Sequence, residues 1–444
     1  DPPVRNFKRR MIMKLPVYFR QSWQIMLKDR QYSLIYIIGV ALSMAFVMAL
    51  LMFVLMSTRS IYPERDRDRM MLIGSVLLCD ENGNPKLNTM VSSRFAALLR
   101  DAGIDGVENM AVISYPALTK GVDLEAPGRG IVTVPEMYVD DGFWEIFQFE
   151  FVSGRTPSGE WNPALPEAVI SATTARRCFG TEDAAGRELM YGGTLLRVCG
   201  VVRDVPVVAM LTDAGIWLPR QMGQEMTSLI HSEPYIGTDI VCLLAGSRRD
   251  FPEIRTGVEE VIARYNASYG KTDGMYISTE ETVPLTYLGA STDAHAGAFI
   301  SAIIAVVLLL MLIPAVNLSG MVSSSVEERI SEFGVRKAYG APVGVLVKQV
   351  LSENFFLTLI GGLAGMFCAG GLLRLLSPVL AGSKSGYGTG VLQADLVFPT
   401  DVFLRVDVYA AVFVCVLLLN LLSSLIPVLR AVRSNVTDSL NEKK

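Results

Sequence analysis

The sequence lacks the short motifs on which most catalytic sites depend. It contains no G-x-x-x-x-G-K-[S/T] phosphate-binding loop and no G-x-S-x-G nucleophile elbow, so nothing in it predicts nucleotide hydrolysis or serine-hydrolase chemistry. Its only two histidines, His231 and His295, have no neighbouring set of metal-ligating residues. We therefore expect a chain that binds no cofactor or metal and is not itself an enzyme.

Cysteine is also scarce, and its six positions show no C-x-x-C pair or other close spacing. A disulfide framework or a zinc site normally shows such spacing. The sequence leaves open whether any of the four cysteines in the long polar stretch form disulfides, namely Cys79, Cys178, Cys199 and Cys242. Cys368 and Cys415 lie in apolar runs.

Long uncharged runs are what the sequence does contain. Hydrophobic residues make up 51% of its 444 residues, and four runs without charge cover residues 32–56, 296–326, 354–373 and 408–429. Each run reaches the roughly 20 residues that an α-helix needs to cross a bilayer. The pattern predicts an α-helical membrane protein with four transmembrane helices and a large domain between the first two.

Charge is divided between the two kinds of segment. Residues 59–294 hold 21 basic and 33 acidic side chains, whereas the rest of the chain holds 19 basic and 11 acidic ones. Eight of the basic residues lie among residues 1–30, against only Asp1 and Asp29. Because loops on the cytoplasmic side carry the excess of Lys and Arg, we expect both termini in the cytoplasm and the acidic stretch outside.

The outer stretch has the pattern of an α+β domain. A strand at residues 70–79, a helix at 91–100 and a strand at 107–114 form one predicted βαβ-like half. The second half has a strand at 238–244, a helix at 251–265 and a strand at 275–278. Residues 115–235 between the halves are rich in Gly, Pro and short apolar stretches, which predicts a β-rich insertion.

Two side-chain clusters in this domain have competing interpretations. The mixed charges of residues 59–69 are typical of a solvated face. An aromatic cluster could be a ligand box or a nucleic-acid stacking platform, but a domain core is favoured because acidic surroundings repel a phosphate backbone. The aromatic cluster consists of Phe143, Trp144, Phe147, Phe149 and Phe151. No nucleic-acid partner is expected.

A short charged segment, residues 326–342, separates the second apolar run from the third. At helical spacing it is amphipathic, with Glu332 placed four residues before Arg336 in the favourable order. Gly340 is suited to end a helix and Pro342 to begin the next. From these residues alone the segment is a surface helix that could be no more than a solvated loop between two spans.

The order of these residues, E-E-R-I-S-E-F-G-V-R-K-A-Y-G-A-P from Glu327, resembles the loop after the second span in the FtsX-like permease family, which includes MacB-type exporters. The resemblance implies that the segment is a coupling helix that docks on a separate ABC-type ATPase, which would bind the ATP and magnesium. The matching residues proposed for coupling are Glu328, Arg329, Glu332, Phe333, Gly334, Arg336, Lys337 and Gly340.

The outer stretch resembles the same family's MacB-like extracytoplasmic domain. The matching features are the Gly154-Arg155 turn, the Phe179-Gly180 helix end and the V-x-G-V-V-x-D-V-P strand of residues 198–206. In the third apolar run, Gly361, Gly365 and Ala369 have the spacing that allows close helix packing. Whether they pack within the chain or across a dimer is left open.

These features predict the following order of segments. A cytoplasmic amphipathic helix (1–31) leads to the first span (32–58) and then to the outer domain (59–293), whose halves, 59–114 and 236–293, flank the insertion 115–235. The second span (294–325), the coupling helix (326–342) and the third span (343–376) follow. An outer loop (377–405), the fourth span (406–429) and a cytoplasmic tail (430–444) complete the predicted order. We expect an anchoring first span rather than a cleaved signal peptide, because the apolar run is long and lacks a small-residue cleavage site.

The resemblance implies a stand-alone permease subunit in a bacterial inner membrane, which transmits the movement of the ATPase to the outer domain for export or extraction of cargo. Its expected partners are the ATPase, a second copy or a similar permease, membrane lipids and, as in MacB-type exporters, a periplasmic adaptor with an outer-membrane channel. Two alternatives stay open: a signalling permease that regulates an extracytoplasmic hydrolase, and a membrane sensor without an ATPase.

Overall fold

A computed structural model describes residues 30–74, 76–79, 85–114, 121–126, 128–206, 209, 211–226, 236–268, 281–282 and 342–382, with isolated positions in 301–339 and 410–429. The chain divides into two compact units. The membrane unit comprises Asp1–Phe53, Ile300–Leu375 and Asp401–Lys444, and the outer unit comprises Val54–Phe299 and Leu376–Thr400.

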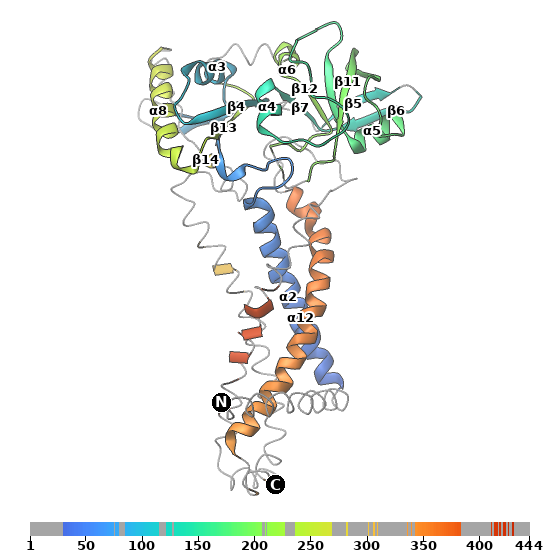
Figure 1. Cartoon of the computed structure of the whole chain (residues 1–444), viewed down its shortest axis with the longest axis vertical. Coiled ribbons are helices and arrows are strands. Elements are labelled where there is room, and N and C mark those ends of the chain that lie inside the picture. The colour runs from blue at the N-terminus through green and yellow to red at the C-terminus, as the bar shows by residue number, and fades with distance from the viewer. Residues whose placement is uncertain are drawn as a thin grey trace, which may run out of the picture. The chain divides into compact units, whose positions relative to one another are not determined.

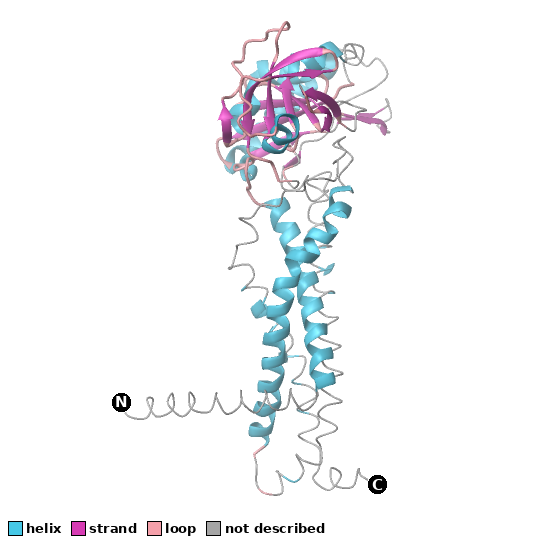
Figure 2. Ribbon diagram, turned by 90° about the vertical axis from the view of Figure 1, so that its right-hand side faces the viewer, coloured by secondary structure: helices cyan, strands magenta, loops and turns pink. Residues whose placement is uncertain are grey.

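Two long helices dominate the described part of the membrane unit, α2 (Arg30–Thr58) and α12 (Val343–Gly382) (Figures 1 and 2). Their most apolar windows, Ser33–Leu50 and Val347–Leu372, are the two described segments long and apolar enough to cross a membrane. At 1.5 Å per residue, helices of 29 and 40 residues are about 43 and 60 Å long. They coincide with the first and third predicted spans, whereas the second and fourth lie outside the described residues except at isolated positions.

The outer unit is built on a mixed sheet of twelve described strands, which Figure 1 shows with its helices. The order is β14-β1-β13-β4-β7-β12-β9-β11-β10-β5-β6, and β8 also pairs with β11. The strands are β1 (Met70–Ile73), β4 (Val107–Ser114), β5 (Val122–Ala126), β6 (Gly130–Val134), β7 (Glu136–Val139), β8 (Phe151–Gly154), β9 (Glu167–Ser171), β10 (Glu188–Tyr191), β11 (Thr194–Val202), β12 (Ile216–Pro219), β13 (Asp239–Ala245) and β14 (Glu281–Thr282). A separate hairpin pairs β2 (Val76–Cys79) with β3 (Pro85–Thr89).

The two halves predicted from the sequence interleave in this sheet. β13 pairs antiparallel with both β1 and β4, so β1 and β4 are parallel strands with β13 between them. In the same way β1 separates β13 from β14. Each β-α-β unit is therefore split by a strand of the other, and the predicted strand at residues 70–79 is two strands, β1 and β2. The predicted strand at 275–278 lies outside the described residues.

Two helices cover this part of the sheet, α3 (Ser93–Ala102) and α8 (Phe251–Ser268). Ser92 caps α3 by accepting a hydrogen bond from the backbone N–H of Phe95, and Gly103 ends it in the left-handed region at φ 58°. The edge-to-face contact of Phe95 with Tyr265 joins the two helices over a common hydrophobic core.

The insertion forms the other end of the sheet and has its own hydrophobic core. Its helices are α4 (Asp141–Ile146), α5 (Ala172–Phe179) and α6 (Arg220–Met226). Gly154 ends β8 at φ 78°, where an added Cβ would lie 2.2 Å from the carbonyl oxygen of Cys199, so only glycine fits. The next residue, Arg155, forms a bidentate ion pair with Glu167.

Three cysteines of this unit, Cys178, Cys199 and Cys242, are buried free thiols.

Candidate functional site

All eight predicted coupling residues lie outside the described residues. They are Glu328, Arg329, Glu332, Phe333, Gly334, Arg336, Lys337 and Gly340. Within the segment, Val335 and Tyr339 are described and exposed, and the backbone N–H of Tyr339 donates to the carbonyl of Val335 at 3.1 Å. This bond has the i to i+4 spacing of an α-helix. The role of the segment stays a prediction.

Two glycines of the predicted small-residue spacing in the third span contact α2 of the same chain. A Cβ added to Gly361 would lie 2.8 Å from Cβ of Val40 on α2, and one added to Gly365 would lie 2.5 Å from the carbonyl oxygen of Ala41. Both glycines therefore let the α2 backbone approach more closely than any side chain would allow. Ala369, one turn further along α12, is fully buried.

A buried hydrogen bond extends this contact, because the hydroxyls of Tyr36 on α2 and Thr358 on α12 lie 3.1 Å apart. Residue numbers rise together along both helices, from Tyr36–Thr358 to Ala41–Gly365, so the helices are parallel. The first and third spans of a four-span chain cross the membrane in the same direction, which agrees with this arrangement. Gly362 faces Phe413 of the fourth predicted span, whose ring would meet a Cβ there at 2.5 Å.

The linking segment, residues 59–69, follows α2 directly and is only in part the solvated face predicted from its charges, because Arg59, Arg65 and Asp68 are exposed. Glu64 and Arg67 are fully buried, and Nε of Arg67 donates to Oε2 of Glu64 at 2.6 Å. The other carboxylate oxygen accepts hydrogen bonds from the backbone N–H of Leu211 and from the hydroxyl of Thr212. A charged pair in this position is stable only because these additional bonds replace water.

Neighbouring residues tie the same segment to other loops of the outer unit. The hydroxyl of Tyr62 donates to the carbonyl of Arg203 at 3.1 Å, and the backbone N–H of Gln148 donates to the carbonyl of Pro63 at 3.0 Å. Arg65 and Glu150 form an exposed ion pair at 2.7 Å. The end of α2 is thus followed by a segment fixed at several points to loops of the outer unit.

Asp213, next to this buried pair, gives the outer unit a predicted pH dependence. Burial and the nearby Glu64 raise the pKa of Asp213 to about 7. The folded protein therefore keeps a proton that the unfolded chain loses near pH 4, so this side chain lowers the free energy of unfolding as pH rises to 7. The full shift corresponds to about 4 kcal/mol, and we expect about 1–3 kcal/mol because Asp213 is not completely enclosed.

Asp213→Asn should remove this dependence. In thermal unfolding of the purified full chain between pH 5 and pH 8, the variant should gain stability over the wild type as pH rises. Asp105→Asn, at an exposed position, is the control and should follow the wild type. If Asp213→Asn and the wild type differed in stability by the same amount at pH 5 and at pH 8, the raised pKa of Asp213 would be contradicted.

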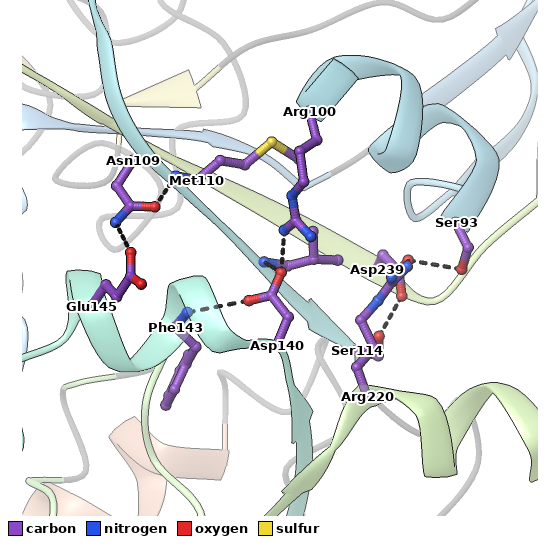
Figure 3. Close-up of polar contacts among 11 residues, drawn as sticks. Ser93, Arg100, Asn109, Met110, Ser114, Asp140, Phe143, Glu145, Arg220 and Asp239 are labelled. Carbon is purple, nitrogen blue, oxygen red and sulfur yellow. Dashed lines mark hydrogen bonds and ion pairs between the residues drawn. The ribbon is translucent and has the colours of Figure 1, made fainter. Parts of the chain in front are cut away.

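Two carboxylates, the buried Asp239 and the largely buried Asp140, join the interleaved halves to the insertion (Figure 3). Asp239, at the start of β13, accepts hydrogen bonds from Ser93 of α3 and Ser114 of β4 and pairs with Arg220 of α6. Asp140, at the end of β7, accepts from the backbone N–H groups of Val112 and Phe143 and pairs with Arg100. Burial raises the pKa of Asp140 above its ordinary value, and the ion pair with Arg100 offsets part of the rise.

These carboxylates were missed in the sequence, although one signal was present. Asp140 precedes a short apolar helix and accepts from the N–H three residues later, which is the N-cap pattern of Asp.

The aromatic cluster is in part the predicted core, since Phe143 and Phe147 are buried. Trp144 differs because it is partly exposed and lines a surface cavity.

These features define a class of protein: an integral membrane protein that carries an α+β domain between spans packed through glycine. The sequence model of the MacB-like periplasmic core domain matches residues 33–271, and that of the FtsX-like permease C-terminal domain matches residues 303–436. The chain therefore belongs to the MacB-like family of FtsX-like ABC transporter permeases, which is embedded in the membrane and has a periplasmic domain. Neither matched region is an ATPase domain.

Curated relatives agree with this membership. An ABC transporter permease of Bacillus subtilis, YknZ, is 23% identical over 54% of this chain and 57% of its own length. The macrolide export ATP-binding/permease protein MacB of Sodalis glossinidius is 24% identical over 86% of this chain and 52% of its own. The chain spans about half the length of the curated relatives it matches. Among solved structures, the extracellular domain of YknZ is 15% identical, with a TM-score of 0.35 over 47% of this chain and all of that domain.

Proposed function

We propose that the chain is the permease subunit of an ABC exporter and transmits ATP-driven movement of a separate ATPase to its outer domain. The observation that carries the proposal is the path of α2 and the linking segment. α2 is one helix from Arg30 to Thr58, and the next residues hold the fully buried Glu64–Arg67 pair of the outer unit. A displacement of the end of α2 would therefore be passed to the outer sheet rather than absorbed by a loose linker.

The contact between α2 and α12 supports the same role. α12 begins at Val343, directly after the predicted coupling segment, and packs on α2 through Gly361 and Gly365. A push on the coupling segment would reach α12 first and α2 through this close contact. We propose a pair of permease chains, either identical or similar, with two ATPase subunits on the cytoplasmic side of a bacterial inner membrane.

The coupling segment provides the direct test. Gly334→Leu should leave the chain folded and bound to its ATPase but reduce cargo transport at least about tenfold while ATP hydrolysis continues, since glycine here allows close docking. Gly344→Leu is the matched control, because a Cβ at Gly344 meets nothing within 4 Å. ATP hydrolysis and transport are measured with the reconstituted complex in vesicles. Unchanged transport by Gly334→Leu would refute the coupling role.

The same reconstituted complex separates export from signalling. Movement of a cargo across or out of the membrane on ATP addition supports the exporter. Stimulation of an extracytoplasmic hydrolase without such movement would replace it with the signalling function. Failure of any ATPase to co-purify with the chain would favour a sensor.

A further inference from the structure

The glycine contact between α2 and α12 repeats along the helices, so it does not by itself select one register (Figures 1 and 2). Gly361, Gly365 and Ala369 follow one another at intervals of four residues on α12, and all three are buried. Gly361 lies against Val40 of α2, and Gly365 lies against Met44 one turn further on. If α12 slid by one turn along α2, Gly365 would take the place of Gly361 and Ala369 that of Gly365. The α2 side chains would again meet small residues, so close packing tolerates this slipped register.

A slide of α12 in the opposite direction is excluded by size. It would bring Leu357 to the position of Gly361, where a Cβ alone would lie 2.8 Å from Cβ of Val40. A leucine side chain does not fit in that space without moving the α2 backbone. The slipped register, with Gly365 at the position of Gly361, is therefore the one alternative that packing leaves open.

Buried polar side chains occupy the same helix contact, in the turns that precede the glycines. They are Ser33 and Tyr36 on α2 and Glu353, Asn354 and Thr358 on α12, and each is at most 6% exposed. The hydroxyls of Tyr36 and Thr358 lie 3.1 Å apart. The carboxylate of Glu353 lies close enough to Tyr36 for its charge to act on the tyrosine hydroxyl.

The slipped register would break this polar contact. Gly362 would take the place of Thr358 opposite Tyr36, and glycine has no side chain to bond the hydroxyl. A hydroxyl without a partner in the hydrocarbon core is unfavourable, because no water replaces the lost bond. The same slide would carry Glu353 one turn, about 5 Å, away from Tyr36. The polar side chains thus distinguish two registers that the small residues accept alike.

We propose that Tyr36 and Thr358 are positioning residues that fix the register of α12 on α2. A single buried polar contact selects one register among several with similar apolar packing in coiled coils, and the same physics applies here. The register itself does not depend on the proposed export function. Its consequence rests on that function: α12 begins at Val343, directly after the predicted coupling segment, so a fixed register would pass a displacement of α12 to α2.

Disulfide cross-linking of the full chain in lipid nanodiscs, with an added oxidant, tests the register. Met48→Cys with Ala369→Cys reports the register of the structure, because both residues are buried one turn beyond the contact of Met44 with Gly365. Met44→Cys with Ala369→Cys reports the slipped register. Since a disulfide requires closely placed Cβ atoms, we expect the first pair to cross-link at least about tenfold faster than the second.

The background of these reporters is kept simple. Cys368→Ala and Cys415→Ala remove the native thiols of the apolar runs, and only cross-linked chains of monomer mass are counted. The double variant Tyr36→Phe/Thr358→Val keeps the side-chain shapes and removes both hydroxyls. It should lower the ratio of the two cross-linking rates at least about threefold, the typical effect of one interhelical hydrogen bond in a membrane. The yield of monodisperse protein should stay the same, because replacing both partners by apolar groups of the same shape is nearly neutral.

A matched variant and a milder one complete the test. Ser352→Ala removes a hydroxyl that donates to the carbonyl of Gln349 in the same helix at 2.7 Å, so it should leave the ratio unchanged. Tyr36→Phe alone removes one oxygen atom and should lower the ratio as well.

Three results would overturn the positioning role. The first is equal cross-linking rates of the two reporter pairs before any hydroxyl is removed. The second is an unchanged ratio in both Tyr36 variants, whether or not the yield of folded protein falls. The third is an equal fall of the ratio in Ser352→Ala. No ATPase is present, so a failure here is distinct from a failure of the proposed export function.

Discussion

Gly365→Leu is expected to separate α2 from α12 and to remove folded protein from the membrane. Already the first atom of the new side chain would lie 2.5 Å from the carbonyl oxygen of Ala41 and 2.7 Å from Cβ of Met44. Neither atom can move away without displacing the α2 backbone. Overpacking of this kind typically costs about 1–3 kcal/mol, and we expect the upper end or more because the obstacle is backbone.

The measurement is thermal unfolding of the full chain in detergent, followed by light scattering and by the amount of monodisperse protein after heating. Gly365→Leu should lower the midpoint by roughly 5 °C or more. Gly361→Leu should behave similarly, because its Cβ would meet Val40 at 2.8 Å. Gly371→Leu provides the matched control on the same helix, since a Cβ there meets nothing within 4 Å.

Equal midpoints for Gly365→Leu and Gly371→Leu would show that α2 and α12 do not depend on this contact. A loss of transport in Gly365→Leu without a loss of stability would be a different result, in which the close contact serves transmission rather than folding. The Gly→Leu series therefore tests packing and coupling separately.

The sequence predicted the elements of this protein better than their pairing. The uncharged runs at residues 32–56 and 354–373 fall inside α2 and α12, because an apolar run of that length has few alternatives. The predicted strand at residues 107–114 has the same bounds as β4. By contrast, the placement of β13 between β1 and β4 depends on contacts across more than a hundred residues, which local pattern does not encode.

The candidate sites show the same division. The spacing of Gly361 and Gly365 predicted a close helix contact but could not name its partner, which the structure identifies as α2. The buried Glu64–Arg67 pair was missed because its hydrogen bonds come from Leu211 and Thr212, far along the chain. Charged side chains are almost always exposed unless they are paired, so the charges of residues 59–69 by themselves predict an exposed segment.

Arg67→Met is the second change for which we expect a large effect. It leaves the Glu64 carboxylate fully buried without its guanidinium partner, and removing one member of a buried pair typically costs about 3–5 kcal/mol. Arg65→Met two residues earlier is the matched control, because the Arg65–Glu150 pair is about half exposed and such pairs contribute less than about 1 kcal/mol.

The double variant Glu64→Gln/Arg67→Met distinguishes the charge from the packing. Glutamine is neutral and retains an oxygen that accepts from Leu211 and Thr212, so much of the lost stability should return. Thermal unfolding of the wild type, Glu64→Gln, Arg67→Met and the double variant, each as the full chain, gives the coupling energy between the two positions. Equal losses in Arg67→Met and Arg65→Met would mean that the buried pair does not hold the linking segment.

The functional consequence follows from where the linking segment lies in the chain. It is the first structure after α2, so an Arg67→Met chain that still folds at low temperature would join the membrane span to the outer domain through a loosened connection. Under the proposed function, ATP hydrolysis by the partner ATPase should then continue while transport falls, as expected for Gly334→Leu in the predicted coupling segment. If transport instead fell only in proportion to the amount of folded protein, the buried pair would serve stability alone, and transmission would have to run through α12.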